Sequence, residues 1–127
     1  MTPAHEVEIR WADLDGFGHA SHRAYIDFLE EARNAFLDAA IGPDLRAGLV
    51  IRRLALDYLA QLTQADDSVR VVVRVESVGA DEVTTAEEVY SAADGRLAVR
   101  ATCVLTTPDA ATIAALRAVA ETPAQHG

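Results

Sequence analysis

The stretch RWADLDGFGHASHRAY, residues 10–25, decides the fold because it connects two segments of different periodicity. Before it, residues 5–11 alternate between polar and apolar side chains, which is typical of a half-buried β-strand with Trp11 on the inward face. After it, residues 22–40 repeat apolar side chains at helical spacing. The stretch itself is rich in Asp and Gly and predicts a turn that leads from the strand into a long helix.

The predicted helix has a broad apolar stripe and a clear signal at each end. Ser21 is suited to the N-cap position because its hydroxyl can accept a hydrogen bond from the Ala24 amide. Gly42-Pro43 is expected to end the helix. The stripe consists of Tyr25, Ile26, Phe28, Leu29, Ala32, Phe36, Leu37 and Ala40. A stripe of this width has to be buried against another layer of structure.

Most of the remaining chain reads as strands. Four are predicted, at residues 49–59, 69–76, 83–90 and 97–106. Asp94-Gly95 between the last two is a strong signal for a hairpin turn. Residues 110–120 predict a short helix, and residues 122–127 are expected to fray.

This order predicts an α+β fold in which a curved antiparallel β-sheet wraps around one long central helix. Consecutive strands joined by tight connections pair antiparallel, and one long amphipathic helix has one sheet to pack against. Such a sheet leaves edge strands unpaired, so we expect a homodimer or a homotetramer. A chain of 127 residues suffices for one core, and residues 1–127 are expected to form a single domain.

The composition excludes several classes of protein. A hydrophobic content of 50% is too high for a disordered chain, and no apolar run reaches the length of a membrane span. The net charge of −9 argues against a nucleic-acid partner, because phosphate binding needs a basic surface. The single cysteine, Cys103, excludes an internal disulfide framework and a cysteine-built zinc site. Residues 1–10 do not resemble a signal peptide, so we expect a cytoplasmic protein.

The start of the predicted helix places a backbone donor beside a loop rich in Asp and Gly, residues 13–18, here called the acidic loop. As the first helical residue, His22 has an amide without an intrahelical partner, at the positive end of the helix dipole. Such a donor can polarise a carbonyl and stabilise an oxyanion. Asp15, in the loop just before, can supply a base or a nucleophile to the same spot. From the residues alone, a carboxylate in this place more often caps the helix or solvates the turn.

The residues of this loop also permit other roles. Two histidines, His19 and His22, lie near the loop aspartates and raise the question of a metal site. A strand–loop–helix corner directs these side chains apart, so we expect no metal. His19 is better suited to ordering the acidic loop than to direct catalysis. Ser21 and His22 are adjacent in sequence, which seldom permits the geometry of a catalytic pair.

Three further side chains have structural expectations. Asp13 is expected to anchor the loop or to pair with an arginine. Glu30 is expected either to form an ion pair with Arg33, three residues further along the helix, or to approach the pocket of a neighbouring subunit, and the ion pair is favoured. Cys103 lies on the apolar face of a predicted strand and is expected to be an inert core residue.

The stretch that opens the helix resembles the active-site signature of hotdog-fold acyl-CoA thioesterases, in the 4-hydroxybenzoyl-CoA thioesterase family. The matching positions are Trp11, Asp13, Asp15, Gly18, His19, Tyr25, Phe28, Glu30, Ala32 and Arg33. Further on, Asp57-Tyr58-Leu59 resembles a strand motif of the family, and Ala65-Asp66 stands where a Gly-Asp turn is usual. The family's Asn-Asn pair is replaced here by Ser21-His22, and Ser21 can still cap the helix.

The resemblance implies a hotdog fold and hydrolysis of an acyl-CoA thioester in a pocket at a dimer interface, without a metal or redox cofactor. Asp15 would be the catalytic carboxylate, either attacking the thioester carbon or activating a water, and the His22 amide would polarise the carbonyl. His19 completes the candidate catalytic set. Two alternatives stay open: a thioesterase for acyl-carrier-protein conjugates, and a non-catalytic module that binds acyl-CoA.

Candidate substrate-binding residues surround this set. They are Gly18, Ser21, Tyr25, Phe28, Arg52 and Arg53. The two aromatic side chains would border the acyl group, although packing in the core explains them equally well. CoA carries phosphates that require cationic partners, and Arg52 and Arg53 are the candidates for that role.

Overall fold

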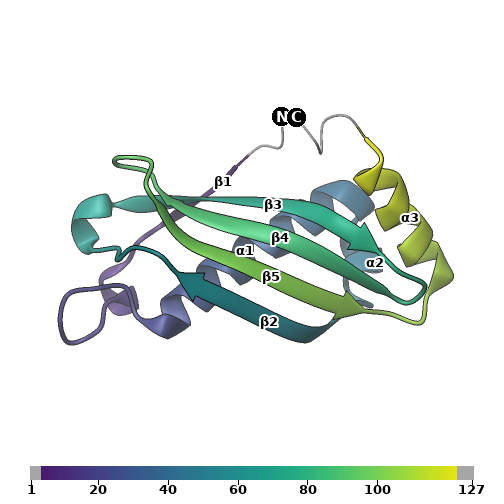
Figure 1. Ribbon diagram of the computed structural model, residues 1–127, viewed down its shortest axis with the longest axis horizontal. Coiled ribbons are helices and arrows are strands. Elements are labelled where there is room, and N and C mark those ends of the chain that lie inside the picture. The colour runs from purple at the N-terminus through teal and green to yellow at the C-terminus, as the bar shows by residue number, and fades with distance from the viewer. Residues whose placement is uncertain (1–3, 123–127) are drawn as a thin grey trace.

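In the computed structural model, which describes residues 4–122, five antiparallel strands form one sheet and a long helix lies along one of its faces (Figure 1). The strands are β1 (His5–Glu8), β2 (Val50–Tyr58), β3 (Ser68–Val78), β4 (Glu82–Ser91) and β5 (Leu97–Thr106). Their order across the sheet is β1-β3-β4-β5-β2, and each neighbouring pair is antiparallel. The predicted α+β arrangement of a sheet against one central helix is confirmed.

The helices begin and end close to the predicted positions. They are α1 (His22–Ile41), α2 (Pro43–Arg46) and α3 (Ala110–Ala120), together with the short 3-10 turns η1 (Trp11–Asp13) and η2 (Gln64–Asp66). Ser21 caps α1 as predicted, since its hydroxyl accepts a hydrogen bond from the Ala24 amide at 3.3 Å. At the other end, Gly42 adopts φ +88°, a left-handed conformation that favours glycine and stops α1. The predicted frayed end, apart from Thr122, lies outside the described residues.

The core fills the space between α1 and the sheet. Alternate residues of β3 point into it, which confirms the period-2 pattern read from the sequence. Its buried apolar residues include Tyr25, Phe28, Leu29, Ala32, Val69, Val71, Val73, Val89, Val99 and Ala101. A second cluster lies at the other end of α1 and includes Leu37, Cys103 and Leu116 from α3.

Two apolar residues assigned to the interior are exposed instead. Trp11 is 84% exposed because β1 ends at Glu8 and the chain then turns through η1, which breaks the alternation before Trp11. Ile26 is 42% exposed, so the buried stripe of α1 is narrower than predicted. The structure thus corrects the width of the buried face at the N-terminal half of α1.

A buried ion pair joins α1 to the sheet beneath it. Arg33 is 2% exposed, and its Nε and Nη2 atoms donate to the two carboxylate oxygens of Glu87 on β4 at 2.7 and 2.8 Å. The Thr85 hydroxyl donates to the same carboxylate at 2.7 Å. The expected pair between Glu30 and Arg33 is therefore wrong, because the arginine turns inward to a strand rather than along its own helix. An ion pair with two hydrogen bonds compensates the free-energy cost of removing both charges from water.

Cys103 is buried beside this ion pair, as predicted. Burial raises the pKa of its thiol to about 11. The thiol is therefore protonated at neutral pH, and a protonated, buried thiol is a poor nucleophile. This agrees with the expected role of Cys103 as an inert core residue.

Candidate active site

The acidic loop is anchored at Asp13, which is 3% exposed. One oxygen of its carboxylate accepts a hydrogen bond from the Arg10 backbone amide at 2.8 Å, and the other accepts from the Arg10 side chain at 3.0 Å. Burial raises the pKa of Asp13, but the hydrogen bonds from Arg10 outweigh it and leave the pKa below its usual value. The Asp13 carbonyl also accepts from the Ser21 amide at 2.8 Å. Asp13 therefore anchors the loop and pairs with an arginine, as predicted, and its carbonyl also ties the loop to the start of α1.

Asp15 is held differently, by backbone amides on one side only. Its Oδ1 accepts hydrogen bonds from the amides of Phe17 at 2.8 Å and His19 at 3.1 Å. These two hydrogen bonds lower the pKa of Asp15, which is exposed to solvent. Within the described residues, no donor bonds to Oδ2, so this oxygen is available to a substrate or a water. Gly18 completes the turn at φ +82°, where a β-carbon would be strained.

The role expected for His19 is met by its main chain. Its amide orders the Asp15 carboxylate, and its carbonyl accepts from the Asp15 amide at 2.7 Å. His19 also lines the pocket described below.

The start of α1 presents a free backbone donor. The chain before it is fixed by the Ala20 amide, which donates to the Leu62 carbonyl at 2.8 Å, and by the Ser21 cap. No acceptor within residues 4–122 bonds to the amide of His22, the first helical residue. An unpaired N–H at the positive end of a twenty-residue helix is suited to bind the oxygen of a polarised carbonyl.

These groups meet in an open pocket of about 400 Å³. It is lined by Asp15, His19, Ala20, Ser21, His22, Tyr25, Tyr58, Leu59, Ala60 and Gln61. The structure thus brings together five of the predicted site residues, which are Asp15, His19, Ser21, His22 and Tyr25. The four residues from Tyr58 to Gln61 had no role in the predicted site, although Tyr58 and Leu59 belong to the strand motif noted above.

Aromatic rings form one side of the pocket. The imidazole of His22 lies edge-on to the ring of Tyr58, with centroids 5.1 Å apart, and Tyr58 in turn lies 5.4 Å from Tyr25. The Tyr25 hydroxyl accepts a hydrogen bond from the Leu62 amide at 3.3 Å. Burial raises the pKa of Tyr25, so the hydroxyl keeps its proton at neutral pH. Aromatic surfaces with this spacing offer an apolar wall to an acyl group.

The pocket lining lacks four predicted substrate-binding residues, which are Gly18, Phe28, Arg52 and Arg53. Phe28 is 2% exposed and belongs to the core. Arg52 and Arg53 lie toward the start of β2, whereas Tyr58, which lines the pocket, is its last residue. The Arg52 guanidinium donates to Glu82 at 2.8 Å. Within one chain, therefore, these two arginines are not placed beside Asp15.

Neither a metal site nor a membrane-spanning helix is found among the described residues. Between residues 4 and 122, no group of three His, Cys, Asp or Glu side chains is arranged to hold a metal ion. Over the same range, every helix is too short or too polar to cross a membrane.

Several solved structures have a similar fold. A thioesterase from Thermus thermophilus, crystallised with coenzyme A and zinc, is 26% identical; the match covers 96% of this chain and 97% of that protein, with a TM-score of 0.81. The 1,4-dihydroxy-2-naphthoyl-CoA thioesterase Slr0204 from Synechocystis is 16% identical, with coverage of 96% and 100% and a TM-score of 0.76. The DHNA-CoA thioesterase from Staphylococcus aureus is 20% identical, with coverage of 87% and 76% and a TM-score of 0.72. The last two matches show a shared fold.

Sequence comparison identifies the family. No curated protein matches the chain. The family model of the thioesterase-like superfamily, however, matches residues 9–125, which include the acidic loop, α1 and all strands from β2 onward. Given this match and the shared fold, the chain belongs to the thioesterase-like superfamily and is a thioester hydrolase of hotdog fold.

Proposed function

We propose that the protein hydrolyses an acyl-CoA thioester to the free acid and CoA, with Asp15 as the catalytic carboxylate. One observation carries the proposal: Asp15 has one oxygen held by two amides and the other free, at the same pocket as the unpaired His22 amide. A thioester needs these two groups, a nucleophile or base for its carbonyl carbon and a donor for its oxygen. Coenzyme A bound to the similar thioesterase from Thermus thermophilus supports CoA as the thiol.

The reaction begins with the thioester carbonyl oxygen on the His22 amide, which stabilises the negative charge that develops during attack. In one route, Oδ2 of Asp15 bonds to the carbonyl carbon, the carbon–sulfur bond breaks, and CoA leaves as a thiolate. Water then cleaves the mixed anhydride and regenerates the carboxylate. In the other route, water attacks the carbonyl carbon directly and Asp15 accepts its proton. The carbon–sulfur bond then breaks, and CoA leaves as a thiolate that takes up a proton.

The lowered pKa of Asp15 meets a requirement that both routes share. Hydrogen bonds from the Phe17 and His19 amides keep the carboxylate ionised at neutral pH. The same hydrogen bonds make the carboxylate a weaker base and also a weaker nucleophile, so they act on both routes in the same direction.

We further propose that a second copy of the chain covers the free edge of β2. Within residues 4–122, this strand pairs only with β5 and ends the sheet on that side. It exposes large apolar side chains, of which Val50 is 63%, Ile51 46% and Tyr58 47% exposed. An edge with unpaired backbone groups and apolar side chains favours association with another strand. Light scattering at micromolar concentration should give the mass of two or more chains, and a monomer would contradict this proposal.

The test of the activity is the release of free thiol from short, long and aromatic acyl-CoAs by the wild type and by Asp15→Asn. We expect the substitution to lower kcat by about a hundredfold or more, the scale for the loss of a catalytic base or nucleophile. Asp44→Asn is the matched control, because Asp44 is an exposed aspartate on α2, away from the pocket. Turnover that survives Asp15→Asn would refute the role of Asp15. No turnover on any CoA ester would refute the choice of CoA and direct the assay to carrier-protein thioesters.

A further inference from the structure

One wall of the pocket has no regular secondary structure of its own. Residues 59–62, here called the wall segment, connect the end of β2 to η2 and include three of the pocket residues. At its start, the amides of Leu59 and Ala60 donate to the Ala98 carbonyl at 2.8 and 3.2 Å. The rest of the segment is held by contacts with other parts of the molecule.

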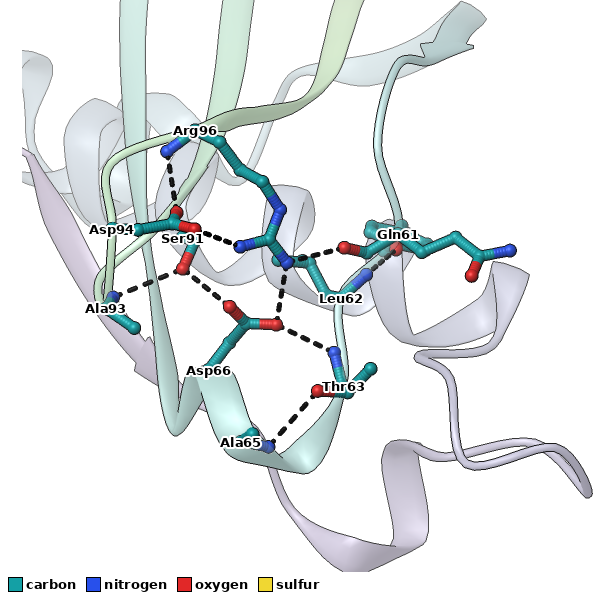
Figure 2. Close-up of polar contacts among 10 residues, drawn as sticks. Gln61, Leu62, Thr63, Ala65, Asp66, Ser91, Ala93, Asp94 and Arg96 are labelled. Carbon is teal, nitrogen blue, oxygen red and sulfur yellow. Dashed lines mark hydrogen bonds and ion pairs between the residues drawn. The ribbon is translucent and has the colours of Figure 1, made fainter.

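The guanidinium of Arg96 holds the middle of the wall segment (Figure 2). Its Nη2 donates to the Gln61 carbonyl at 2.7 Å and to the carboxylate of Asp66 at 2.9 Å, while Nη1 donates to Asp94 at 2.7 Å. Arg96 lies in the turn between β4 and β5, so these bonds join the wall segment to the hairpin.

The carboxylate of Asp66 is itself fixed in place (Figure 2). Asp66 is 6% exposed, and its Oδ1 accepts from the Ser91 hydroxyl at 2.8 Å. Its Oδ2 accepts from the Thr63 amide at 2.8 Å in addition to Arg96. The guanidinium is therefore oriented by a buried anion that cannot easily move, and it transmits that orientation to the Gln61 carbonyl.

The residue after Gln61 links the wall segment to the start of α1. The Leu62 amide donates to the Tyr25 hydroxyl at 3.3 Å, and the Leu62 carbonyl accepts from the Ala20 amide at 2.8 Å. Ala20 lies two residues before His22, whose amide is the free donor of the site. A shift of the wall segment would thus move an aromatic pocket residue and the N-terminus of α1 together.

From these contacts we infer that Arg96 is a positioning residue for the thioesterase site, acting through the wall segment on Tyr25 and on the His22 amide. The inference deepens the proposed function and rests on it for its kinetic part. Arg96 itself is absent from the pocket lining, so it acts on the site only through other residues.

The forked shape of the guanidinium is what the position requires. A lysine keeps the positive charge but has a single nitrogen, which cannot reproduce the set of bonds to Gln61, Asp66 and Asp94. In catalysis, a misplacement of about 1 Å can cost on the order of a hundredfold in rate. Loss of the fork should therefore lower kcat, whereas substrate binding at an open pocket should change little.

The test compares Arg96→Lys with two controls. We expect kcat to fall by about tenfold or more in Arg96→Lys, with KM within about twofold of the wild type. Arg100→Lys makes the same change on an exposed side chain of β5. Asp94→Asn removes the negative charge of the hairpin partner of Arg96 and leaves the bond from Arg96 to Gln61. Both controls should keep kcat within about twofold. An equal loss in Arg96→Lys and Asp94→Asn would overturn the inference, because the hairpin rather than the wall segment would be responsible.

A chemical rescue separates positioning from a loss of folded protein. Arg96→Ala leaves a gap that free guanidinium ion can fill, so guanidinium chloride at low millimolar concentration should restore part of the lost kcat with saturation. The same addition should leave Asp15→Asn inactive. Absence of rescue in a folded Arg96→Ala would count against the inference, and if Arg96→Ala does not fold, the comparison of Arg96→Lys with its controls decides.

Hydrogen exchange gives a result that does not depend on activity. Peptides that contain the Leu62 and Ala20 amides should exchange faster in Arg96→Lys than in the wild type. In Asp94→Asn, the same peptides should exchange at the wild-type rate. Unaltered exchange in Arg96→Lys would overturn the inference even if the enzyme is active. If the wild type hydrolyses no thioester, the proposed function fails, while faster exchange would still show that Arg96 holds the wall segment.

Discussion

The η1 turn and the loop that follows it each contain an aspartate, and the two behave as different chemical groups. Asp13 is 3% exposed, and hydrogen bonds from Arg10 occupy both of its oxygens. Asp15 is exposed, and its hydrogen bonds from backbone amides all fall on Oδ1. Their separation of two residues along the chain gives no hint of this difference.

The comparison shows that the local environment of an aspartate can suit it to a structural role or to a chemical one. In both aspartates hydrogen bonds lower the pKa, so both are ionised at neutral pH. Only Asp15 retains an oxygen that a substrate can reach. A lowered pKa therefore does not distinguish the two aspartates, whereas the accessible oxygen of Asp15 does.

The substitution Asp13→Asn should have the largest effect on stability and is therefore the strongest test of this comparison. The substitution removes a charge that is hydrogen-bonded on both oxygens, which should cost about 2 kcal/mol of the free energy of unfolding. For a domain of this size that corresponds to a fall in Tm of about 8 °C, measured by thermal unfolding at pH 7. Asp15→Asn should leave Tm within about 2 °C. A larger destabilisation by Asp15→Asn than by Asp13→Asn would reverse the two assignments.

The Tm values of the wild type and Asp13→Asn can also be compared at different pH values, which tests whether the charge of Asp13 stabilises the turn. Because the folded state lowers the pKa of Asp13, its contribution to stability is complete above the unfolded value of about 3.9 and is lost as the pH falls through the folded pKa. The difference in Tm between the two proteins should therefore be full at pH 7 and shrink in acid. A difference that does not change with pH would mean that the charge of Asp13 is not what stabilises the turn.

A smaller effect is expected in the pH dependence of kcat/KM, which tests the role of Asp15. Its lowered pKa means that the ionised, active form persists below the usual value of about 3.9. We expect kcat/KM to stay level from neutral pH into mild acid and to fall only as the pH drops through the lowered pKa, within the range where the protein remains folded. Initial rates in short assays, with circular dichroism as a check on folding, measure this profile. An acid limb centred above about pH 5 would assign the titration to another group.

Local signals explain what could be predicted from the sequence. The limits of α1 depend on Ser21 and on Gly42-Pro43, which act on the helix ends directly beside them. Alternation within β3 likewise predicted which valines are buried, because neighbouring residues of a strand face opposite sides. Asp15 and His22 of the candidate site were also predictable from local sequence, because both lie within the single turn that leads from the loop into α1.

Contacts between distant segments explain what was missed. The wall segment has no charged or metal-binding motif, and its place beside Asp15 depends on the packing of β2 and α1. Arg33 had a nearby acid in Glu30 but pairs with Glu87, 54 residues further along the chain. One signal for that pair was present, because Glu87 falls at one of the alternate positions of β4 that face the interior.

The double contact of Leu62 with the start of α1 also has a consequence for the order in which the molecule is assembled. Its amide reaches the Tyr25 hydroxyl across 37 residues of sequence, whereas α1 forms from contacts about four residues apart. Loop closure over such a distance costs entropy that local helix formation does not, so distant contacts form late. During refolding, therefore, helical content should return before enzymatic turnover. The interval between the two would measure how long the contacts between Leu62 and the start of α1 take to form.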